Sequence, residues 1–147
     1  MANPSDYDRR YLGGILFFNE RDFFEAHEVW ESLWLDCAGP ERRFYQALIQ
    51  AAVALYHYGN GNVRGATKLF RSSKAYMDQY PSPYLGFDAV SFWQQMHRCF
   101  ASLIVDGAET RDPVPLDERL IPTITLNPHP ESWPCMAEFQ TDEDNDS

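Results

Sequence analysis

The segment from Phe44 to Tyr58 constrains the fold most, because it is apolar on nearly every side of a helical wheel. A helix without a polar face must be covered by neighbouring elements on most sides. Its polar exceptions fall within about 60° of one another at the helical repeat, and they are Arg43, Gln46, Gln50 and His57. The sequence therefore predicts a central helix with a single polar seam, surrounded by other helices.

Four further segments carry apolar residues every three to four positions, which is the spacing of amphipathic helices. The predicted helices cover about residues 6–18, 21–35, 41–58, 62–79 and 88–105. Asn62 and Asp88 are good N-cap residues, and Gly59 is a typical helix end. No strand-rich region is present, and short connections favour antiparallel neighbours. The expected fold is all-α, a single compact bundle of about five antiparallel helices over residues 1–105.

Residues 106–147 have a different composition from the predicted bundle. They hold six of the ten prolines, with 11 acidic and 2 basic side chains, whereas residues 1–105 hold 11 acidic and 10 basic ones. We expect an irregular, acidic, Pro-rich tail that is extended near residues 120–126 and docked in part, through Trp133. The last residues, 141–147, are predicted to be disordered.

Composition excludes several classes of protein. The nearly neutral body lacks the basic domain of a nucleic-acid-binding protein, and no apolar run approaches the roughly 20 residues that span a bilayer. The first ten residues carry no secretory signal. The three cysteines are widely spaced and odd in number, which indicates reduced thiols. A cytoplasmic protein that binds neither nucleic acid nor membrane is predicted.

The segment from Phe23 to Trp34 combines large aromatic side chains with glutamates and a histidine. On a helical wheel His27 and Glu31 share one edge of the apolar face at an i, i+4 spacing, while Glu25 and Glu28 point away. His27 to Glu31 reads H-E-x-x-E, one histidine short of the zinc-protease motif. We expect His27, with Glu28 or Glu31, to face the polar seam of the central helix.

Three interpretations of this seam remain open. The favoured one is a buried network of ion pairs and amides that fixes the register of the helices, since buried charges are normally paired. The second is a small-molecule or metal site, with a metal-assisted hydrolase using His27, Glu31 and His57 as the enzymatic alternative. The third is a partner surface. No nucleophile or phosphate-binding loop accompanies these residues, so an enzymatic activity stays undecided and no cofactor is implied.

Two weaker patterns lie further along the chain. A basic stripe on the predicted fourth helix consists of Arg64, Lys68, Arg71 and Lys74. It is typical of a solvated face, although it can also bind an anion or the acidic tail. The Gly-Asn turn before it, with Ala66, Phe70 and Pro81, weakly resembles one tetratricopeptide unit, whereas at least three are normally needed.

Several segments together resemble domain-of-unknown-function family 309: residues 19–34, 47–57, 61–66 and 85–88. The resemblance spans roughly residues 10–90. It implies a compact prokaryotic bundle of about five helices and brings no assigned reaction or cofactor. The positions that match the family pattern are Phe24, Glu25, His27, Glu28, Trp30, Glu31, Trp34, Gln50, His57, Asn62 and Gly65. We therefore predict a binding or structural module, with a small ligand, an anion and a homodimer left open as partners.

Overall fold

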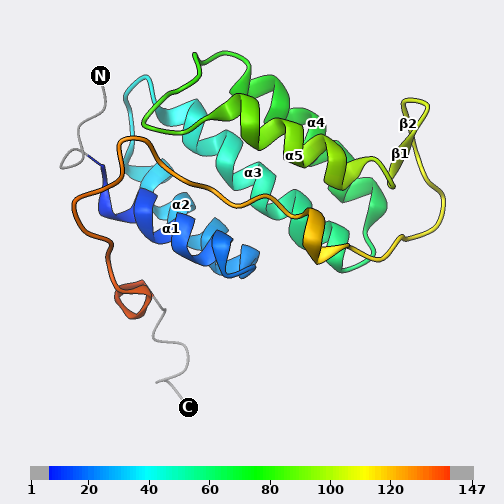
Figure 1. Cartoon of the computed structure of the whole chain (residues 1–147), viewed down its shortest axis with the longest axis horizontal. Helices are drawn as coiled ribbons and strands as arrows, with labels where there is room; N and C mark the ends of the chain where they lie inside the picture. The colour runs from blue at the N-terminus through cyan, green and yellow to red at the C-terminus, as the bar shows by residue number, and fades with distance from the viewer. Residues whose placement is uncertain (1–6, 140–147) are drawn as a thin grey trace.

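The computed structural model describes residues 7–139 and contains five α-helices within them. They are α1 (Arg9–Asn19), α2 (Phe23–Asp36), α3 (Arg42–Gly59), α4 (Val63–Met77) and α5 (Ala89–Phe100). Helix α3 lies between the α1–α2 pair and α4, and α5 lies over the α4 side (Figure 1). The predicted all-α fold with a central third helix is confirmed. No helix of the described residues is long and apolar enough to cross a membrane.

Side-chain caps explain where most helices begin. The carboxylates of Asp8, Asp22 and Asp88 each accept a hydrogen bond from a backbone N–H in the first turn of α1, α2 and α5. Asn62 does the same for α4 through the N–H of Gly65, at 2.9 Å. These bonds satisfy donors that a helix start otherwise leaves unpaired.

Helix α5 ends five residues before the predicted boundary at residue 105. The chain instead forms a small antiparallel hairpin of β1 (Ile104–Val105) and β2 (Ala108–Glu109). Asp106 and Gly107 both have positive φ at its turn, and Asp-Gly is the pair that a two-residue hairpin turn favours. The helical periodicity of residues 88–103 extended the prediction into the first strand of this hairpin.

The centre of the bundle is closely packed around Trp30 of α2. Its side chain is fully buried, and the indole N–H donates to the carbonyl of Tyr11 at 3.1 Å. The ring lies so close to Gly14 of α1 that a Cβ there would overlap it. On the other side of α3, the buried hydroxyl of Ser73 donates to the carbonyl of Ala47 at 2.6 Å. Both contacts fix neighbouring helices at short range.

The segment after the hairpin docks along α1. The side-chain amide of Asn19 bonds both the N–H and the carbonyl of Ile124, at 2.8 and 2.9 Å. Tyr7, just before α1, donates to the carbonyl of Pro128 at 2.6 Å. This segment therefore runs antiparallel to α1 and crosses the molecule in Figure 1. Its apolar side chains Ile124 and Leu126 are buried in the core.

The rest of the tail contains two short 3-10 turns, Glu118–Leu120 and Met136–Glu138. Trp133 is half-buried against the core, as expected, and its indole N–H donates to His129 at 3.4 Å. The predicted disorder of residues 141–147 falls outside the described residues. The division of the chain at residue 105 stays a prediction.

Candidate functional site

The pair of His27 and Glu31 forms as predicted, but it lies at the surface of α2. His27 Nε2 is 3.2 Å from Glu31 Oε2, and the side chains are 21% and 46% exposed. His27 Nδ1 lies 3.1 Å from the carbonyl of Phe24. All these partners belong to α2, so the pair does not link helices. Surface pairs at this spacing contribute about 0.2–0.5 kcal/mol.

The polar stripe of α3 faces α4. The Arg43 guanidinium lies 5.3 Å from the centre of the Tyr76 ring, and Gln46 lines with Arg43 a cavity of about 440 Å³ beside Gln79. His57 Nδ1 is 3.3 Å from Asn62 Nδ2 at the turn between α3 and α4. The polar stripe therefore lies on the side of α3 that faces α4. It does not lie on the side that faces α2.

The predicted seam across α2 and α3 is therefore not found as a set of contacts. Among residues 7–139, no hydrogen bond or ion pair joins His27 or Glu31 to Arg43, Gln50 or His57. Glu28 lies on another side and lines a cavity of about 370 Å³ with Arg10 of α1. Glu25 is half-buried. The Oε1 atom of Gln50 is buried without a hydrogen-bond partner.

Aromatic and cationic side chains occupy the surface where α2 and α3 meet. The Arg42 guanidinium lies 4.0 Å from the centre of the Trp34 ring. At the other end the rings of Phe24 and Tyr56 are 5.8 Å apart, and these side chains are 46% and 40% exposed. We call these four residues, with His27, the α2–α3 face. Arg42 and Tyr56 were missed because their rotation relative to α2 depends on the packing of the two helices.

No metal-binding cluster is present in the part of the chain that the structure describes, where three or more His, Cys, Asp or Glu side chains never gather closely enough to hold an ion. His27 and Glu31 lie together, but His57 makes its contacts at the α3–α4 turn. The metal-assisted hydrolase alternative thus lacks its predicted set of three ligands.

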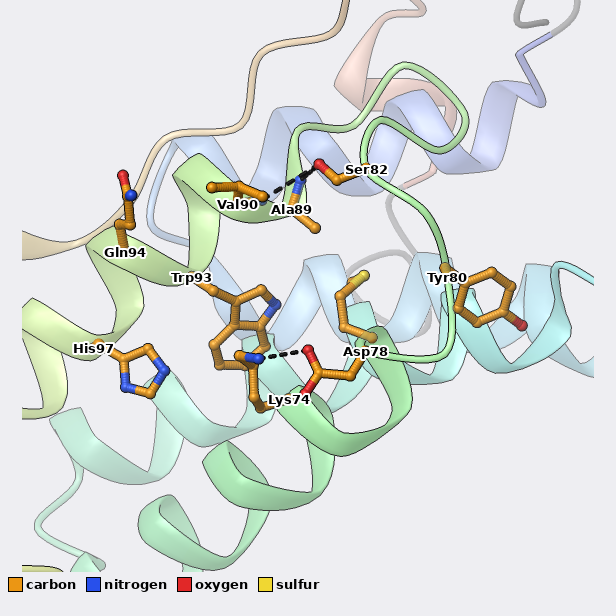
Figure 2. A pocket seen from close by; sticks show the side chains of 10 residues that line it. Lys74, Asp78, Tyr80, Ser82, Ala89, Val90, Trp93, Gln94 and His97 are labelled. Carbon is orange, nitrogen blue, oxygen red and sulfur yellow. Dashed lines mark hydrogen bonds and ion pairs between the residues drawn. The ribbon is translucent and has the colours of Figure 1, made fainter.

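A groove lies between α4 and α5. It consists of two cavities of about 340 and 640 Å³. Lys74, Asp78 and His97 line both cavities, so the two adjoin. We call them together the α4–α5 groove. Figure 2 shows Lys74 of α4 and Asp78, the residue directly after α4, on one side of the cavity, with Trp93 and His97 of α5 on the other.

The polar groups of this groove are only partly paired. Lys74 Nζ lies 2.5 Å from Asp78 Oδ1, and Arg71 donates to the carbonyl of Gly107 at 2.9 Å. Trp93 is 4% exposed, and its buried indole N–H has no hydrogen-bond partner among the described residues. A buried donor without an acceptor costs about 1–3 kcal/mol. The groove wall therefore carries an unsatisfied polar group.

Part of the lining of this groove was predicted from the sequence. Arg71 and Lys74 belong to the predicted basic stripe. The ring of His97 meets the edge of Phe70, with 5.1 Å between ring centres. The groove itself depends on the separation of α4 and α5, which no local pattern encodes.

The helices define a small all-α protein, and the comparisons with known proteins agree with the predicted resemblance. Residues 11–69 match the model of the family described as Domain of unknown function (DUF309). The chain is 38% identical over 69 residues to the uncharacterized protein YpuF of Bacillus subtilis (strain 168), over 46% of this chain and 40% of that protein. It is 29% identical over 72 residues to an uncharacterized protein of Aquifex aeolicus (strain VF5), over 48% and 22% of the two chains.

The matched region spans less than half the length of these relatives. In this chain it covers α1 to α3 and the first half of α4. The α2–α3 face lies within residues 11–69, whereas every residue that lines the α4–α5 groove lies beyond them. The family match therefore carries no information about the groove.

Proposed function

We propose that this protein is a binding module that takes a small ligand in the α4–α5 groove. The observation that carries the proposal is the pair of adjoining cavities, of about 340 and 640 Å³, which share the polar side chains Lys74, Asp78 and His97. Pockets for small molecules typically measure about 300–1,000 Å³ and combine apolar walls with a few convergent polar groups. Both properties are present here.

The test uses a variant that fills the groove. Ala75 is exposed on α4 and lines the larger cavity, so Ala75→Trp places an indole in it. Lys68→Trp is the matched control, because Lys68 is exposed on the same helix and lines neither cavity. Two-dimensional NMR with a fragment library measures binding and maps it onto the backbone amides. We expect fragments to shift amides of α4 and α5 in the wild type and in Lys68→Trp, but not in Ala75→Trp.

The proposal fails if no fragment shifts the groove amides. It also fails if Ala75→Trp binds the same fragments as the wild type, with circular dichroism showing that both variants are folded. Shifts confined to α2 and α3 would instead support the α2–α3 face as the binding surface.

A second candidate function is contact with a protein partner through the α2–α3 face. Phe24 and Tyr56 favour it, because two adjacent aromatic rings that are 46% and 40% exposed are typical of interaction surfaces. This candidate keeps His27 and Glu31, the predicted site residues, at the edge of the surface. The charge-reversal variant Glu31→Lys would weaken capture of a partner and leave the groove unchanged.

We also propose a cytoplasmic location and no nucleic-acid partner. The three free cysteines support a reducing compartment. Burial raises the pKa of the Cys99 thiol to about 12, so this thiol stays protonated and unreactive. Residues 1–105 hold 11 acidic and 10 basic side chains, so the body lacks the strongly basic surface of a nucleic-acid-binding domain.

A further inference from the structure

We infer that the ligand of the α4–α5 groove is an amphipathic carboxylate, with an apolar body in the larger cavity and its acid group at Arg71 and Lys74. This inference rests on the proposed binding function and adds the chemical class of the ligand. Three observations support this inference: the apolar wall of the larger cavity, the two cations at its edge, and the pairing of its acidic side chain, Asp78, with Lys74.

The wall of the larger cavity is aromatic and aliphatic. The rings of Phe70 and Phe100 are stacked with 4.4 Å between centres and 21° between planes. Phe70 and Phe100 are only 5% and 1% exposed, so they form the floor of the cavity, and its accessible apolar surface comes mainly from Ala75, Ala101 and Ile104. A ligand that covers this wall gains about 25 cal/mol for each Å² of apolar surface removed from water. The body of the ligand is therefore an alkyl chain or a ring.

Two cations border this wall on the same edge of α4. Arg71 and Lys74 are three residues apart, so their side chains lie on one side of the helix, and both line the larger cavity. Arg71 uses one nitrogen, Nη2, in its bond to the Gly107 carbonyl, which leaves the remaining guanidinium donors available to a ligand. A guanidinium offers a fork that matches the two oxygens of a carboxylate.

Asp78 is the one acidic side chain that lines either cavity among residues 7–139. Its carboxylate is paired with Lys74. Two cations thus face one anion, and the groove carries a net positive charge that opposes a cationic ligand. A polyanion such as a nucleotide fits less well, because only two cations are present and one already has a partner. A single negative charge balances the groove.

The experiment compares three probes with the same eight-carbon chain, octanoate, octylamine and octanol, by isothermal titration calorimetry on the full chain. We expect octanoate to bind at least tenfold more tightly than octylamine, with octanol between them. Arg71→Gln and Lys74→Gln should each weaken octanoate about tenfold, since a hydrogen bond to a charged group is worth about this factor. Octanol should bind these variants as it binds the wild type.

Two further variants make the test directional. Lys68→Gln removes a cation of the same stripe that lies outside the groove, and it should leave octanoate binding unchanged. Asp78→Asn removes the competing anion and should tighten octanoate severalfold. If Lys68→Gln loses as much octanoate affinity as Lys74→Gln, the effect comes from general surface charge. That result would overturn the inference.

The two levels of the proposal fail in different ways. Equal binding of octanoate, octanol and octylamine overturns the carboxylate assignment and leaves the groove as a site for apolar ligands. Binding of none of the three probes, together with the absence of fragment shifts on α4 and α5, overturns the proposed function itself. Tighter binding of octylamine than of octanoate reverses the charge assignment and also overturns the inference.

Discussion

Helices α1 to α4 and the α4–α5 groove differ in what their side chains do. In the first region the residues of the family pattern make short structural contacts: Trp30 packs on Gly14, and Asn62 caps α4 beside His57. In the second region α4 and α5 touch through Phe70, and beside this contact Lys74, Asp78 and His97 line open space. The recognisable motif mainly specifies how the helices pack, whereas the space for a ligand lies where packing is sparse.

This difference changes how the His-Glu motif is interpreted. A histidine and glutamates among tryptophans suggest chemistry, yet Trp30 is a packing residue and the His27–Glu31 pair is a surface contact within one helix. Residues 11–69 match the family model, so a matching sequence indicates a shared arrangement of α1 to α3. The comparison between the two regions can be tested by stability and binding measurements on the same variants.

The largest effect is expected for Trp30→Ala. Removing a fully buried indole leaves a cavity at the α1–α2 contact and should lower the free energy of unfolding by about 3–5 kcal/mol. Urea denaturation followed by circular dichroism measures it. A loss below about 1 kcal/mol would show that this region is packed less closely than the structure indicates.

Gly14→Ala should come next, at about 1–3 kcal/mol of lost stability, because the added methyl group overlaps the Trp30 ring. Gly59→Ala is the matched control. A Cβ at Gly59 meets its nearest atom, of Leu116, at an ordinary 3.7 Å, so this variant should be neutral or slightly stabilising. Alanine has a higher helix propensity than glycine, so propensity alone would stabilise both variants. A loss in Gly59→Ala as large as that in Gly14→Ala would show that the effect does not arise from the Trp30 contact.

Asn62→Ala should cost about 1 kcal/mol, the typical value for a lost N-cap. The substitution removes the acceptor for the Gly65 N–H and the contact with His57. Thermal unfolding measures the change, and Asn62→Asp, which retains an acceptor, should recover most of it. If the melting temperature of Asn62→Ala equals that of the wild type, Asn62 does not stabilise the start of α4 as proposed.

Lys74→Gln should have the smallest effect on stability, within about 0.5 kcal/mol, because its ion pair with Asp78 is partly exposed. The same variant is expected to weaken octanoate binding about tenfold. Weaker octanoate binding without a loss of stability would show that Lys74 serves the groove and not the packing of the helices. A stability loss of several kcal/mol would assign Lys74 to the structural contacts instead.

The sequence predicted the five helices because each carries a regular apolar stripe and most begin at a strong cap such as Asp88 or Asn62. It did not predict which side of α3 meets which neighbour. A helical wheel gives the relative angles of Arg42 and Arg43, but the choice between α2 and α4 depends on how all helices pack. The hairpin after α5 was missed because two-residue strands have no periodicity to detect.

For the candidate site too, contacts within one helix were predictable from the sequence and contacts between helices were not. His27 and Glu31 were paired correctly, since an i, i+4 spacing fixes that contact within one helix. The proposed contacts across helices required their relative rotation, which local spacing does not contain. The cations Arg71 and Lys74 were identified as a stripe, but their position beside Phe70 and Phe100 of the groove arises from the fold.

The bond between Tyr7 and Pro128 joins residues that are 121 positions apart in the chain. During synthesis α1 to α4 can form and pair locally as they leave the ribosome, yet the segment around Ile124 that covers α1 is made much later. One apolar edge of α1 therefore stays uncovered until residues 124–128 have been made. Chains with contacts of high sequence separation fold slowly, so we expect this segment to close over the first helix late in folding.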